Sequence, residues 1–318
     1  MTTGPGEHAA TPHGFELPPD DQRLLRSLPP PEALAWVAGA VGAGARVTAV
    51  RAMEGGTSSA VHCVDVVDRS GRRYALVLRR YVRADWLADE PDVPVREAST
   101  LQVLRGSAVA APELVGVDPD GGASGGTPAL AMTRLDGRLD WSPADLEPYL
   151  ERLACVLPRI HAVPLPGRCP LPAYRPYALR MHRQPRWALR PRVWEQAIEV
   201  LDGSPPGRAG GVLIHRDYHP GNVLWRKGMV TGVVDWANAS VGMPEADVGH
   251  CRANLYGRFG SEAADRFLTM YHACSGRRDY HPYWDIAAAI GGMGRSLDDR
   301  PNLADEAFLE AAVRRLGA

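Results

Sequence analysis

The chain has 318 residues, of which 45% are hydrophobic and 23% are charged, and its formal net charge is −1. This composition is that of a globular protein with a sizeable core, and the near-zero charge argues against nucleic acid or a membrane surface as a partner. No segment is apolar over the length of a membrane span, and the polar start is not a signal peptide, so we expect a cytoplasmic protein. The five cysteines form no C-x-x-C pair. We therefore expect reduced thiols, with neither a disulfide framework nor a zinc site.

The N-terminal part of the chain predicts a small antiparallel sheet. Residues 1–18 are rich in Gly, Pro, Thr and His, and we expect a disordered tail there. A short helix is expected over 29–44, between prolines and glycines, and another over 93–109. Segments rich in β-branched and apolar residues predict five strands, at 45–53, 60–68 and 73–81 and as two more within 111–137.

The rest of the chain is predicted to be mainly helical. Segment 142–163 has helical periodicity with leucines on one stripe, and two short strands interrupt the helical pattern within 213–236. The expected fold class is therefore α+β with two lobes. A small N-lobe with an antiparallel sheet and one helix spans 19–135, and a larger helical C-lobe spans 136–318.

The stretch LIHRDYHPGNVLW, residues 213–225, has the spacing H-x-D-x-x-x-x-N. In this pattern Asp217 can accept or orient the proton of a hydroxyl group, and Asn222 can bind Mg²⁺. Asp235 ends a short apolar run nearby, where a carboxylate can hold the same ion. The alternative is a turn in which Asp217 and Asn222 cap local backbone and His215 is a core histidine. We favour phosphoryl transfer because Asp235 completes the set.

A glycine-rich loop lies between the first two predicted strands. Gly55 and Gly56 allow the backbone to turn and approach a phosphate, and the hydroxyl groups of Thr57, Ser58 and Ser59 can donate to it. By itself this loop fits a plain hairpin connection better.

A basic side chain of the third predicted strand is a further phosphate-binding candidate. Arg79 lies on the same strand face as Val77, whereas Arg80 points away. A cation at this place, paired with a carboxylate such as Glu97 on the following helix, reaches the α- and β-phosphates. On these residues alone we favour the alternative, a solvated pair of arginines and an exposed glutamate.

The segments EGGTSSAV, VLRR, REASTLQVL, LAMTRLDG, LIHRDYHPGNVLW and GVVDWANASVGMPEADVG together resemble the aminoglycoside phosphotransferase and choline-kinase-like group of small-molecule kinases. The resemblance runs over about residues 45–255. It implies a protein-kinase-like fold, with a purine nucleotide bound between a nucleotide-binding N-lobe and a C-lobe that carries the catalytic loop, the metal site and the acceptor site.

The resemblance also implies roles for residues of the C-lobe. Asp217 is expected to be the catalytic aspartate, with Asn222 and Asp235 as ligands of Mg²⁺. His215 orients the catalytic loop, and Asp247, in MPEADVG, is expected to brace it without a chemical role.

In the N-lobe, the resemblance implies that AMTRL is the hinge, with Met132 behind the base and the backbone of Thr133 and Leu135 bonded to its edge. Arg79 stands where the family most often has lysine. Lys227 is the only lysine of the chain, so composition accounts for this change, and a guanidinium group keeps the charge and can grip phosphate with two nitrogens.

The expected reaction is direct in-line transfer of the γ-phosphoryl group of ATP or GTP to a hydroxyl of a small molecule, without a phosphoenzyme. We expect an antibiotic as acceptor, in resistance, self-protection or biosynthesis. Segment 174–192 is strongly basic and is expected to be a solvated face; if it lines the acceptor site, it favours a nucleoside antibiotic or a macrolide over a polycationic aminoglycoside. A metabolic kinase for choline, homoserine or a sugar, and a pseudokinase module that binds nucleotide without turnover, stay open as alternatives.

Overall fold

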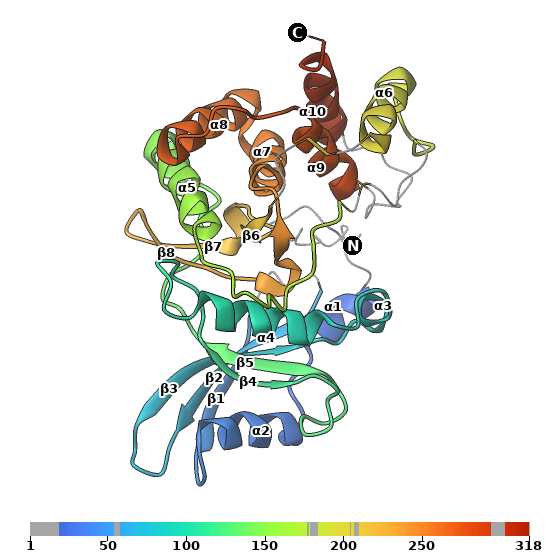
Figure 1. The fold of residues 1–318 in the computed structure, drawn as a ribbon. Coiled ribbons are helices and arrows are strands. Elements are labelled where there is room, and N and C mark those ends of the chain that lie inside the picture. Colours follow the sequence, from blue (N-terminus) through green and yellow to red (C-terminus); the bar gives the residue numbers. More distant parts are fainter. Residues whose placement is uncertain are drawn as a thin grey trace, which may run out of the picture. The chain divides into compact units, whose positions relative to one another are not determined.

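The computed structural model describes residues 19–53, 58–176, 178, 184–203, 205–206, 210–293 and 303–317. The expected tail over 1–18 and the loop residues Gly55, Gly56 and Thr57 lie outside the described residues. The chain divides into two compact units (Figure 1). Unit 1 runs to Gln102 and includes Pro112–Leu135, and unit 2 consists of Val103–Ala111 and Asp136–Ala318.

Unit 1 is built on a five-stranded antiparallel sheet with the strand order β1-β2-β3-β5-β4. Its strands are β1 (Arg46–Ala52), β2 (Ala60–Val67), β3 (Arg73–Arg80), β4 (Leu114–Asp118) and β5 (Ala129–Thr133). The turn between β2 and β3 is tight because the Asp68 carboxylate accepts from the backbone N–H groups of Ser70 and Arg72, at 2.8 and 3.0 Å. All five predicted strands are therefore present.

Four helices accompany this sheet, namely α1 (Pro19–Arg26), α2 (Pro31–Val41), α3 (Ala84–Asp89) and α4 (Val93–Leu104). Helix α2 covers one face of the sheet, where Ala33 and Val37 pack on apolar side chains of β2 and β3 (Figure 1). The helix predicted over 93–109 ends at Leu104, because Gly106 takes a left-handed conformation, with φ of 74°. Helices α1 and α3 were not predicted.

Unit 2 is mainly helical, as expected. Its helices are α5 (Leu146–His161), α6 (Pro191–Asp202), α7 (Glu245–Phe259), α8 (Ser261–Ser275), α9 (Tyr283–Met293) and α10 (Leu303–Arg314). Four short strands form two antiparallel pairs, β6 (Val212–Ile214) with β9 (Ser240–Gly242) and β7 (Val223–Arg226) with β8 (Met229–Val233). The prediction of two strands was thus incomplete. The α+β fold class is confirmed, and within the described residues every helix is too short or too polar to span a membrane.

Helix α5 is capped at its N-terminus by Asp145, whose carboxylate accepts from the backbone N–H of Glu147 at 3.2 Å. This contact satisfies one of the free donors at the first turn. We expect Asp145→Ala to lower the free energy of unfolding by about 1 kcal/mol. Urea denaturation checks this, with Glu151→Ala on the exposed side of the same helix as control. An Asp145 variant as stable as the control would contradict the assigned cap.

The expectation that all five cysteines are reduced thiols is wrong for two of them. Cys155 on α5 and Cys274 on α8 form a disulfide, and their Cα atoms are 5.4 Å apart. The two cysteines are 119 residues apart in the sequence. They meet because α5 and α8 pack against each other, a contact that no local pattern reveals. The other three, Cys63, Cys169 and Cys251, are free.

Candidate active site

The loop after β6 carries Asp217, and its start is fixed by Asp247 on the first turn of α7. The Asp247 carboxylate accepts from the backbone N–H of His215 at 2.9 Å and from that of Arg216 at 2.6 Å. It also lies 3.1 Å from Nε2 of His161 on α5. Asp247 is fully buried, so it holds the loop from inside the core rather than from solvent.

His215 orients the next part of the same loop. Its ring is fully buried and packs on Trp236, with ring centroids 4.4 Å apart. Nδ1 accepts from the backbone N–H of Asp217 at 3.3 Å, which places the ring proton on Nε2, and Nε2 then donates to the Val234 carbonyl at 2.9 Å. The ring therefore joins the loop to the segment that follows β8.

Arg216 adopts a left-handed backbone conformation, with φ of 68°. A side chain with a Cβ atom is strained there by about 1–2 kcal/mol. The Arg216 guanidinium donates to the Arg175 carbonyl at 2.9 Å and lies over the Tyr174 ring, 5.6 Å from its centroid. These contacts help to hold the loop in the strained conformation.

This strain predicts an inverted order of stability. Arg216→Gly and Arg216→Ala remove the same side-chain contacts, but only glycine is free of the left-handed penalty. We expect the glycine variant to be more stable than the alanine variant by about 1 kcal/mol, as measured by urea denaturation. At an ordinary backbone position the alanine variant is the more stable of the two. An alanine variant more stable than the glycine variant at position 216 would contradict the left-handed conformation of Arg216.

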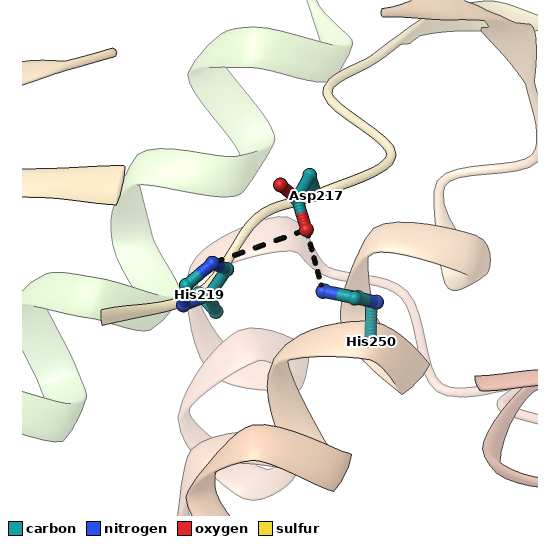
Figure 2. A group of neighbouring side chains, drawn as sticks. All are labelled: Asp217, His219 and His250. Carbon is teal, nitrogen blue, oxygen red and sulfur yellow. Dashed lines mark ion pairs between the residues drawn. The ribbon is translucent and has the colours of Figure 1, made fainter. Parts of the chain in front are cut away.

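The Asp217 carboxylate lies among histidines (Figure 2). Oδ1 is 3.0 Å from Nε2 of His250 on α7 and 3.9 Å from Nε2 of His219, and Oδ2 is 3.2 Å from Nδ2 of Asn222. Burial disfavours the ionised form, but the hydrogen bond from His250 and the nearby histidine rings outweigh it and hold the pKa of Asp217 well below its usual value. With 30% of its side chain exposed, Asp217 is an ionised acceptor that a hydroxyl group can reach.

His250 was missed by the sequence reasoning. It lies three residues after Asp247 on α7, so both side chains lie on the same side of the helix, one turn apart. Because Asp247 was already expected to face the catalytic loop, this spacing was the available signal.

The candidate Mg²⁺ ligands Asn222 and Asp235 flank one end of the β7–β8 hairpin. Asn222 directly precedes β7, Asp235 follows β8 by two residues, and Val223 pairs with Val233. The Val234 N–H donates to the Asn222 carbonyl at 2.9 Å, which extends this register. This register places Asn222 opposite Val234, the residue before Asp235, so the two candidate ligands lie on neighbouring segments of the hairpin.

The groups at this end fit a magnesium ion. The Asn222 amide donates through Nδ2 to the Asp217 carbonyl at 2.8 Å, so its oxygen faces away from that contact. Asp235 has φ of 65° and ψ of 62°, a costly conformation for a residue other than glycine, and such strain gathers at functional sites. Amide and carboxylate oxygens are the ligands that Mg²⁺ prefers.

In unit 1, Arg79 and Glu97 form a buried ion pair, and the alternative of a solvated pair is wrong. Arg79 Nη1 lies 3.1 and 2.9 Å from the two Glu97 oxygens, and the Tyr81 hydroxyl donates to Glu97 at 2.5 Å. Arg80 is buried as well and donates to the Leu28 carbonyl at 3.3 Å. Both arginines at the end of β3 are therefore buried under other segments of the chain. The alternation of residues along β3 does not reveal this burial.

The other nucleotide-site candidates of unit 1 lie on β5 and before β2. Met132 is buried on β5, and Leu135, just beyond the strand, is half-buried. The Thr133 N–H donates to the Glu113 carbonyl at 2.9 Å, which restricts a contact with a base to the Thr133 carbonyl. Ser58 is half-buried and Ser59 is buried.

Solved structures with a similar fold include a macrolide 2′-phosphotransferase type I, with 21% identity, a TM-score of 0.57, and coverage of 95% of this chain and 98% of that chain. A putative aminoglycoside phosphotransferase from Ralstonia eutropha JMP134 has 16% identity, a TM-score of 0.57 and coverage of 90% and 94%. A thermostable mutant of aminoglycoside phosphotransferase APH(4)-Ia, in a ternary complex with AMP-PNP and hygromycin B, has 18% identity, a TM-score of 0.56 and coverage of 85% and 93%.

The fold is thus that of kinase-like phosphotransferases, as the resemblance implied. The chain belongs to the phosphotransferase enzyme family, whose pattern matches residues 49–283. A curated relative, the uncharacterized protein YcbJ of Bacillus subtilis (strain 168), is 25% identical over 226 residues. That match spans 67% of this chain and 66% of the relative.

Proposed function

We propose that this phosphotransferase moves the γ-phosphoryl group of ATP or GTP to a hydroxyl group of a small molecule, with Asp217 as the catalytic residue. The observation that carries the proposal is the Asp217 carboxylate, which is ionised, reachable from solvent, and held by contacts to its backbone and both its oxygens. An ionised carboxylate at this place accepts a hydrogen bond from a hydroxyl group and so orients its oxygen, and it takes up the proton as the bond from oxygen to phosphorus forms.

The proposed reaction is a direct in-line displacement. The acceptor oxygen forms a bond to the γ-phosphorus while the bond to the β,γ-bridging oxygen breaks, and the hydroxyl proton moves to Asp217. Bound Mg²⁺, held by Asn222 and Asp235, would neutralise the charge of the phosphates. Arg79, oriented by Glu97, would bind phosphate oxygens, and the nucleoside diphosphate leaves without a phosphoenzyme.

We propose an antibiotic of low positive charge, such as a macrolide or a nucleoside antibiotic, as the acceptor. Arg216 directly precedes Asp217 and lies over Tyr174, in the basic segment 174–192. A cationic side chain next to the catalytic aspartate, together with a basic segment in contact with it, disfavours a polycation. The fold is similar to that of both a macrolide and an aminoglycoside phosphotransferase, which is consistent with either acceptor. The positive charge near Asp217 therefore decides between the two acceptors.

Choline is disfavoured by the surroundings of the aromatic residues Tyr280, Tyr283 and Trp284, which with Asp285 are the candidates for an aromatic cage. Tyr283 and Trp284 are buried in the core of unit 2, and the Tyr280 hydroxyl donates to the buried Asp285 at 2.6 Å. These rings therefore pack in the interior and form no open cage for a quaternary ammonium group.

The test is release of nucleoside diphosphate from ATP and from GTP across a panel of macrolides, nucleoside antibiotics, hygromycin B and kanamycin, with Asp217→Ala as the blank. Turnover that depends on the acceptor and vanishes in the variant is the expected result. Kanamycin as the best acceptor would overturn the charge argument. Nucleotide binding without turnover on any acceptor would favour first a metabolic kinase for an acceptor outside the panel, and then a pseudokinase.

A further inference from the structure

Three possible metal ligands converge at the catalytic loop. One ligand atom from each of Asp217, His219 and His250 lies within 4.8 Å of the other two. Figure 2 shows that Asp217 and His219 come from the loop, whereas His250 reaches in from α7. The three side chains thus come from two segments whose relative position is fixed by the contacts of Asp247 with the loop.

The ligand types suit a different ion from Mg²⁺. Two imidazole nitrogens and one carboxylate oxygen are a ligand set of zinc sites, whereas Mg²⁺ prefers oxygen ligands. Bonds of about 2.1 Å to a tetrahedral ion place neighbouring ligand atoms about 3.4 Å apart. The pairs Asp217–His250 at 3.0 Å and Asp217–His219 at 3.9 Å bracket this separation, and the third pair, His219–His250, lies within 4.8 Å, so side-chain rotations have to bring the two rings closer to a tetrahedral ion.

An ion can reach the cluster from solvent. The side chains of Asp217 and His250 are 30% and 27% exposed, and that of His219 is 9% exposed. Three protein ligands with a solvent-facing side leave the fourth position of a tetrahedral ion to water.

Of the three side chains, His219 has to give up the most existing contacts in order to bind a metal ion. Its Nδ1 accepts from the backbone N–H of Gly221 at 3.1 Å, and Nδ2 of Asn222 lies 3.3 Å from its Nε2. Binding an ion through Nε2 requires the proton on Nδ1, so the Gly221 contact is given up and the Asn222 amide shifts. His250 and Asp217, at 3.0 Å from each other, therefore form the principal pair.

We propose that Asp217, His219 and His250 bind a Zn²⁺ ion that inhibits the enzyme. With Zn²⁺ bound, the Asp217 carboxylate is a metal ligand and no longer receives a hydroxyl proton, and the shift of Asn222 disturbs a proposed Mg²⁺ ligand. The ion site stands on the geometry of the three side chains, whereas its inhibitory effect rests on the proposed function.

The binding test is titration of the full chain, stripped of metal, with Zn²⁺ by calorimetry and with Co²⁺ by visible absorption. We expect one ion per chain, affinity reduced more than about 10-fold in His250→Ala, and a smaller loss in His219→Ala. His281→Ala, at an exposed histidine elsewhere in unit 2, is the matched control and should bind like the unaltered chain. Thermal unfolding without metal establishes that each variant is folded.

Two binding results would overturn the site. One is equal affinity in the His250→Ala and control proteins. The other is a Co²⁺ spectrum with strong thiolate charge-transfer bands, which would assign the ion to a free cysteine instead.

Inhibition is measured separately, with Mg²⁺, nucleotide and acceptor present throughout, as the rate of nucleoside diphosphate release with added Zn²⁺ relative to the zinc-free rate of the same protein. Loss of turnover in the unaltered chain at Zn²⁺ concentrations that fill the site is the expected result. Full turnover with the site filled would overturn the proposed inhibition by Zn²⁺. No turnover even without Zn²⁺ would count against the proposed function, while the binding result would stand.

Discussion

We expect the Asp217→Asn variant to lose phosphoryl transfer, with kcat reduced on the order of 10³-fold or more. The amide has the shape of the carboxylate but cannot receive a hydroxyl proton at neutral pH. Because the contacts of Asp217 through its backbone N–H and carbonyl stay in place, the loop should keep its conformation. The loss is therefore expected in kcat, with the affinity for nucleotide within about threefold of the unaltered value.

Steady-state turnover on the best acceptor of the panel measures kcat, and calorimetry measures nucleotide affinity. Asp202→Asn, at an exposed position at the end of α6, is the matched control and should keep full activity. Unchanged kcat in Asp217→Asn would show that another group receives the proton, and would remove the main support for the proposed site.

The second large effect is expected at Asp247, although this residue touches no substrate. Its carboxylate accepts from the backbone N–H groups of His215 and Arg216 and contacts His161, and it is fully buried. Asp247→Ala leaves these polar groups without their acceptor in the interior, at about 1–3 kcal/mol for each such group. We expect unfolding to become easier by about 3 kcal/mol or more, and kcat to fall together with it.

Urea denaturation and turnover should be measured on the same Asp247→Ala preparation. Glu262→Ala, an exposed acid in the first turn of α8, serves as the control for loss of a carboxylate. If stability fell while kcat per folded molecule stayed the same, Asp247 would support the core of unit 2 without orienting the catalytic loop.

What could be predicted from the sequence was local. The five strands of unit 1 follow from short runs of β-branched residues with turn residues between them, and the spacing of Asp217 and Asn222 within one loop can be read directly from the chain. The fold class and the family followed from these features and are confirmed. The chemical roles of the site residues remain predictions.

What could not be predicted depends on contacts between distant segments. The disulfide joins helices through cysteines 119 residues apart, and β9 pairs with β6 although the β7–β8 hairpin separates them in the chain. The buried state of Arg79 depends on α4 packing over β3, since nothing in the alternation of β3 itself distinguishes a buried arginine from a solvated one. The contact of His250 with Asp217 likewise depends on α7 packing against the loop, and its only trace in the sequence is the spacing of His250 from Asp247.

The number of residues in the β7–β8 hairpin sets the positions of Asn222 and Asp235 relative to each other. Their separation is set by which residues of the two strands pair, from Val223 with Val233 to the turn at Lys227. Exchanging one side chain for another along the hairpin leaves that pairing intact, whereas adding or removing one residue in either strand shifts it and reverses which side chains face inward. Evolution or engineering can therefore vary the exposed side chains of this hairpin, such as Arg226 and Met229, but its length is under the same constraint as the two proposed ligands.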